Sequence, residues 1–158
     1  MARHHPQAIK VAVVHEPPVV RVLPDSPKWL SFFASVYRTS FRYNIPLASF
    51  KFNLSLSIPF RAFKSVPKDF QKRVTEANNE YFLIRHELIP SVNYQPDTDR
   101  IKQNGVKIVM AAGQMTQAKG KYYGRTVPIL AEKLGCEMVT LPGHHLSFFD
   151  MPNEWATA

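Results

Sequence analysis

Three short apolar runs constrain the fold of this chain more than any other feature. They are Ile9–His15, Gly105–Gly113 and Cys136–Leu141, and each has the length of a strand. Nearly continuous apolarity is typical of strands that are covered on both faces, as in a parallel sheet. Between the last two runs, Gly120–Leu134 has the length of a helix and is closed by Gly135. This strand–helix–strand order predicts a parallel pair with a right-handed crossover, and therefore an α/β fold.

The long segment between the first two runs has a different character. Pro27–Tyr43 is rich in aromatic residues and is predicted to be helical, whereas Asn44–Pro67 is interrupted by prolines and is predicted to be loop with short helical turns. Asp69–Leu88 predicts one continuous helix, because its apolar residues fall on a single stripe, and Pro90 is expected to end it. Helices inserted between consecutive strands of a parallel sheet are the layout of a cap.

The predicted organisation therefore has three parts. Residues 1–17 contribute one strand of the core sheet, residues 18–104 form a helical cap, and residues 105–158 add strand, helix, strand and the beginning of a terminal helix. Pro128 lies inside the expected crossover helix and predicts a late start or a kink there.

Charge is distributed unevenly along the chain, whose formal net charge is +8. From Lys28 to Arg73 there are nine lysines and arginines and a single acid, Asp69. We interpret this excess as a solvated cap surface, with attraction to anionic substrates or lipid as the alternative. No recognisable nucleic-acid-binding motif accompanies it, so no nucleic-acid partner is predicted. No stretch approaches the roughly 20 apolar residues of a membrane span.

Few residues carry signals for metals or disulfides. The single cysteine, Cys136, excludes an internal disulfide framework and a multi-cysteine metal site, and it is expected to be a small buried residue. Asp97 and Asp99 lie on either side of Thr98 and predict a turn or a helix cap rather than paired catalytic carboxylates. No cofactor or metal is predicted.

The last strand continues into a distinctive loop. Its Leu141 is followed by Pro-Gly-His-His, then by apolar residues and the sequence Met151-Pro-Asn-Glu-Trp155. This resembles the histidine loop of the α/β-hydrolase superfamily, whose typical form is P-G-x-H followed by P-E-E-F or a close variant. The order of the other segments is similar as well: a strand, a cap insertion, a second strand, a helix, a third strand and the opening of a terminal helix. The resemblance implies a partial α/β-hydrolase fold of about three parallel strands with an inserted helical cap.

The same resemblance assigns candidate catalytic residues. His145 matches the general base of that superfamily, and an imidazole, which titrates near neutral pH, suits that role. His144, one residue earlier, is the alternative candidate for the base. A purely structural role, in which the loop histidine caps nearby backbone groups, is the non-catalytic explanation. The superfamily usually carries its acid after the second strand, but Gln114–Gln117 contains no carboxylate. Some haloalkane dehalogenase-like hydrolases place the acid after the preceding strand, where this chain has Glu16. Capping of the following turn, or pairing with an arginine of the cap, is the alternative for Glu16.

The nucleophile expected from the resemblance is missing, because no G-x-S-x-G elbow occurs in the sequence. We therefore expect the C-terminal portion of a hydrolase that acts on an ester or similar bond of a small apolar substrate, and expect this chain to be inactive alone. The alternative function is a non-catalytic binding or interaction module, in which the cap holds a partner or lipid. The first strand is expected at a sheet edge and open to self-association. The N-terminus has no apolar signal core. The location is left open, with the cytoplasm favoured.

Overall fold

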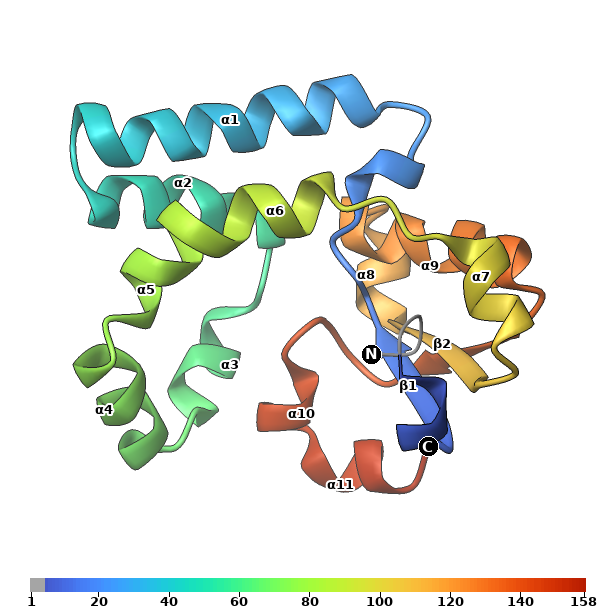
Figure 1. Ribbon diagram of the computed structural model, residues 1–158. Helices are drawn as coiled ribbons and strands as arrows, with labels where there is room; N and C mark the ends of the chain where they lie inside the picture. Colours follow the sequence, from blue (N-terminus) through green and yellow to red (C-terminus); the bar gives the residue numbers. More distant parts are fainter. Residues whose placement is uncertain (1–4) are drawn as a thin grey trace.

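The computed structural model describes residues 5–158 and contains a three-stranded parallel sheet with helices around it (Figure 1). The strands are β1 (Val11–His15), β2 (Lys107–Gly113) and β3 (Glu137–Leu141), and their spatial order is β1-β2-β3. Val11 pairs with Lys107, and Val109 pairs with Glu137, both in parallel register. The predicted α/β class, the three parallel strands and the edge position of the first strand are therefore confirmed.

Most of the helices lie between β1 and β2 in the sequence, and we call this helical segment, residues 18–104, the cap as a purely structural label. They are η2 (Val20–Val22), α1 (Ser26–Arg42), α2 (Ile45–Leu56), α3 (Phe60–Ser65), α4 (Lys68–Glu76), α5 (Asn79–Phe82), η3 (Leu83–Glu87), α6 (Leu88–Asn93) and α7 (Thr98–Gln103). In Figure 1, α1, α2, α5 and α6 lie together on one side of the molecule, away from the sheet. The others are η1 (Pro6–Ala8), α8 (Gln114–Ala118), α9 (Tyr122–Leu134), α10 (Ser147–Asp150) and α11 (Pro152–Ala156).

Two of the predicted segments between β1 and β2 are wrong. Ile45–Leu56 is a full helix rather than a loop, because Asn44 caps it: its side chain accepts a hydrogen bond from the Leu47 N–H at 2.9 Å. The proline that follows the cap lies in the first turn, where a missing N–H costs nothing. The continuous helix predicted over Asp69–Leu88 is broken at Asn78, whose φ of 51° is the left-handed conformation that asparagine tolerates.

Pro90 does not end its helix, contrary to prediction. It lies inside α6, directly after the wide π-turn η3, in which the Leu88 N–H bonds to the carbonyl of Leu83. A π-turn interrupts the regular backbone hydrogen bonds of the helix close to Pro90, which has no N–H to donate. Pro128 likewise lies inside α9, which already begins at Tyr122, so the predicted late start is wrong.

Apolar packing is divided between two clusters that share one helix. Val127, Leu130 and Ala131 of α9 pack with Met110 and Ala112 of β2 to form the sheet core. At the other end of α9, two tyrosines join the cap core. The members of the cap core are Val20, Leu23, Phe33, Val36, Ala48, Ile84, Leu88, Val92, Tyr122 and Tyr123.

An ion pair also joins the cap to α9. The Arg125 guanidinium donates two hydrogen bonds of 2.9 Å to the carboxylate of Asp25, which precedes α1. Arg125 accordingly lowers the pKa of Asp25 below its ordinary value.

The edge strand β1 leaves apolar side chains in solvent. Val11 is 52% exposed and Val13 is 64% exposed, whereas Val14, on the opposite face, packs against the sheet core. Within residues 5–158, no helix is long and apolar enough to cross a membrane.

Candidate active site

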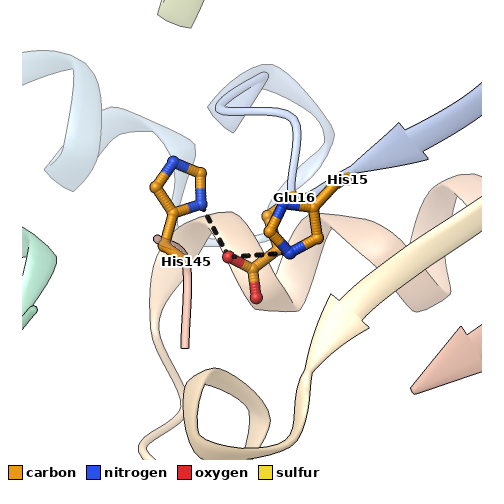
Figure 2. A group of neighbouring side chains, drawn as sticks. All are labelled: His15, Glu16 and His145. Carbon is orange, nitrogen blue, oxygen red and sulfur yellow. Dashed lines mark hydrogen bonds and ion pairs between the residues drawn. The ribbon is translucent and has the colours of Figure 1, made fainter. Parts of the chain in front are cut away.

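The candidate site lies at the carboxyl ends of β1 and β2, where the chain places Glu16 (Figure 2). Glu16 follows the last residue of β1, and its N–H still bonds to the Ala111 carbonyl at 3.0 Å. Its φ of 44° lies in the left-handed region, an unfavourable conformation for a residue with a side chain. Backbone outliers of this kind cluster at functional sites, where the surrounding structure maintains them.

The Glu16 carboxylate is buried and receives two defined hydrogen bonds. Oε1 accepts from the Gly113 N–H at 2.8 Å, and Oε2 lies 2.7 Å from Nδ1 of His145. Burial alone would raise the pKa of Glu16, but the hydrogen bonds from His145 and Gly113 outweigh it, so the pKa is lowered. Glu16 is therefore ionised at neutral pH, and the His145 Nδ1–H donates to it. This leaves Nε2 of His145 as the nitrogen that can take up a proton.

Two glycines bring the histidine loop against the sheet. Gly143 has a φ of 76°, and a Cβ built on it would lie 2.6 Å from the Cβ of Ser147. The Gly143 carbonyl accepts a hydrogen bond of 2.8 Å from the Met115 N–H. A Cβ on Gly113 would come within 2.8 Å of that same carbonyl oxygen. The close approach of β2 to the loop therefore requires glycine at position 113, and the packing of the loop on Ser147 requires glycine at position 143.

Ser147 and Trp155 hold the loop from the other side. The buried Ser147 hydroxyl bonds to the carbonyls of Pro142 and His144 and accepts from the indole N–H of Trp155 at 2.9 Å. The same indole N–H bonds to the Pro142 carbonyl at 3.0 Å. Ser147 is thus fully engaged in structure and does not face the His145 imidazole as a nucleophile.

His144, the neighbouring candidate, has a different environment. It is buried, its Nε2 lies 3.2 Å from Oδ2 of Asp150, and its Nδ1 accepts from the Leu146 N–H. Arg61 of the cap helix α3 reaches the same oxygen of Asp150 at 3.1 Å. His144 therefore organises the loop and its contact with the cap, and it is His145 that meets Glu16.

Tyr123 closes the site from α9. Its ring centroid lies 4.8 Å from that of His145, and its hydroxyl donates to the carbonyl of Leu56 at the end of α2. Burial, followed by the charge of Glu16, raises the pKa of Tyr123 well above its ordinary value. Tyr123 is therefore a neutral side chain that connects the Glu16–His145 pair, which we call the dyad, to the cap.

The structure brings together the two residues predicted from the sequence, Glu16 and His145, and adds a third that the prediction did not include. His15, the last residue of β1, has a ring nearly parallel to that of His145, with centroids 5.5 Å apart and planes inclined by 15°. Its Nε2 lies 3.7 Å from Oε2 of Glu16. Strand alternation could have placed it on the face opposite Val14, but nothing in the sequence brings that face to His145.

These three residues also form a possible metal-ligand set among residues 5–158, since one ligand atom from each lies within 4.8 Å of the others. Two imidazoles and a carboxylate suit zinc and other transition metals. However, His145 Nδ1 donates its proton to Glu16 Oε2, and Oε1 accepts from the Gly113 N–H, so these atoms already have partners. The geometry favours sharing of a proton over ligation of a metal.

The remaining described residues supply no nucleophile beside the dyad. Within residues 5–158, no hydroxyl or thiol hydrogen-bonds to His145. The other sequence candidates lie elsewhere. Asp97 caps α7 by accepting from the Arg100 N–H, as predicted. Cys136 was expected to be buried but is only half-buried beside the sheet core. A concavity of about 640 Å³ between α4 and η3 is lined by neither Glu16 nor His145.

No protein-family model matches the chain, and no solved structure matches it.

Proposed function

We propose that Glu16 and His145 are the acid and base of a hydrolase of the α/β-hydrolase type. The observation that carries this proposal is the 2.7 Å hydrogen bond between Glu16 Oε2 and His145 Nδ1 at the carboxyl end of a parallel sheet. Sites in open α/β sheets form at that edge. The helical segment between β1 and β2, which includes α1 to α6, is the cap of this enzyme.

The proposed mechanism follows from the dyad geometry. Glu16 fixes the His145 tautomer with the proton on Nδ1 and stabilises the imidazolium that forms. Nε2 then takes the proton from a nucleophilic hydroxyl as that oxygen attacks the carbonyl of an ester, and afterwards returns it to the leaving alcohol. The substrate is an ester, or a compound with a similar bond, of a small apolar molecule. The nucleophile and oxyanion hole come from a segment outside residues 5–158.

The test uses the longest translation product that contains this chain. We expect its transcript to encode a G-x-S-x-G elbow before Met1, and the product to be labelled by a fluorophosphonate, which forms a bond with an activated serine. His145→Gln should abolish labelling, whereas His86→Gln, on an exposed face of the cap, should preserve it. The 158-residue chain alone should not be labelled. A transcript without the elbow, or labelling that is indifferent to His145, would overturn the proposal.

One observation favours a second function, a binding module that uses the cap. Large apolar side chains are exposed there, including Phe50 at 61%, Leu54 at 65% and Phe60 at 73%. Exposed apolar patches of this kind mark interaction sites, and the basic excess of the same segment suits an anionic partner. Co-sedimentation with anionic vesicles, lost in Phe50→Ser and Leu54→Ser, would support this function; equal recovery with neutral vesicles or none would oppose it.

A further inference from the structure

His15 is a half-buried titratable residue that the proposed mechanism does not use. Its ring is held between two others: the His145 imidazole stacks on it, and the Trp155 indole meets it edge-on, with centroids 4.9 Å apart. Trp155 is itself fixed by its hydrogen bonds to Pro142 and Ser147. His15 therefore has little freedom to rotate, and its ring forms a rigid surface against one side of the His145 imidazole.

The two imidazoles face the same carboxylate oxygen. Oε2 of Glu16 lies 2.7 Å from His145 Nδ1, a hydrogen bond, and 3.7 Å from His15 Nε2, which is beyond hydrogen-bond reach but within ion-pair distance. The His15 Nε2 atom is buried and has no hydrogen-bond partner among the described residues. Since Oε1 is occupied by the Gly113 N–H, a protonated His15 can gain a partner only at Oε2, in competition with His145.

The groups around His15 favour its neutral form while His145 acts as the proposed base. Burial lowers the pKa of His15, the Glu16 carboxylate opposes that effect, and the charge of His145 lowers it further. The titratable groups around His15 are Glu16 and His145, together with the neutral Tyr123, whose ring centroid lies 4.8 Å from that of His145; Trp155 does not titrate. One carboxylate between two imidazoles can compensate one positive charge well and two poorly.

We propose that His15 is a positioning residue of the dyad, which braces the His145 ring when neutral and competes for Glu16 Oε2 when it takes up a proton. A catalytic role for His15 rests on the proposed function, but its contacts and its titration can be measured without an enzymatic assay. The dyad would then respond to acid. Protonation of His15 weakens the hydrogen bond between Glu16 and His145 and adds a positive charge beside the His145 ring.

The test is a pH titration of the histidine signals of the 158-residue chain by NMR, with His15 assigned from His15→Gln. We expect His15 to titrate below its ordinary value of 6.5. In His145→Gln its midpoint should rise by at least about half a unit, because two unit charges 5.5 Å apart repel by that much even in the dielectric of water. In Glu16→Gln it should fall. The matched control His86→Gln should leave it unchanged.

A second measurement addresses bracing. The Nδ1 proton of His145, deshielded by its bond to Glu16, should persist in His15→Phe, which keeps a stacked ring, and weaken in His15→Ala. If the unmodified chain lacks this signal, the hydrogen bond between Glu16 and His145 is refuted, and the proposed function with it. A signal present in all variants, together with a His15 midpoint that does not respond to His145→Gln, would refute only the inference about His15.

Discussion

Replacement of Glu16 by glutamine tests whether the buried carboxylate holds the histidine loop on the sheet. Glutamine retains the shape of the side chain, and its oxygen can still accept from the Gly113 N–H. The amide –NH₂ then faces His145 Nδ1, so either two donors oppose each other or the imidazole shifts its proton to Nε2. In the second case Nε2 no longer accepts a proton, and the proposed base is lost.

The expected loss of stability follows from the bond that is removed. A hydrogen bond to a charged group contributes roughly 1.5–3 kcal/mol, and the Glu16 side chain is fully buried, so solvent does not screen it. We therefore expect Glu16→Gln to lower the free energy of unfolding by about 2 kcal/mol at pH 7. With a urea m-value of about 2 kcal/mol/M, the midpoint should fall by roughly 1 M at unchanged slope.

The pH dependence separates charge from shape. Because the folded-state pKa of Glu16 is lowered from 4.5, its contribution is complete above pH 4.5 and is lost as the pH falls through the folded-state pKa. Glutamine does not titrate, so the difference between the two proteins should shrink as the pH falls below 4.5. Urea unfolding monitored by circular dichroism at pH 7 and in acid measures this. An equal difference at both pH values would refute the argument from charge.

Three further predictions concern the surroundings of the site. Gly143→Ala should destabilise the chain by about 1–3 kcal/mol, since its φ of 76° and its close neighbours leave no room for a Cβ; thermal unfolding measures this. Asp25→Asn should cost less than about 1 kcal/mol, because its ion pair with Arg125 is about one-third exposed, and the cost should decline with added salt in the same assay. The open edge of β1 should cause association, so Val11→Lys and Val13→Lys together should shift the chain toward monomer in size-exclusion chromatography; a sharp monomer peak before substitution would contradict this.

The sequence was most informative where one local pattern decides the structure. The strands at 107–113 and 137–141 and the helix at 122–134 could be predicted because apolar runs and a terminal glycine define them without help from distant contacts. The pairing of Glu16 with His145 could also be predicted, since both follow strands of a parallel sheet and therefore lie at the same edge.

The errors arose where a single residue or a distant contact overrides the pattern. The apolar stripe over 69–88 does not reveal that Asn78 adopts a left-handed conformation, nor that a π-turn accommodates Pro90. The role of His15 depends on Trp155, 140 positions later, which packs against its ring. Such a contact has no local signature, and only the folded chain brings the two together.

The first turn of α9 limits how the cap could have been acquired or exchanged. Tyr122 and Tyr123 belong by sequence to the helix that supports the sheet, yet they are packed in the interior of the cap. A recombination event that replaced residues 18–104 with another cap would leave both rings without their partners. It would also leave the carboxylate-binding fork of Arg125 empty. The cap and α9 therefore have to change together, and the smallest transferable unit runs from the cap through α9.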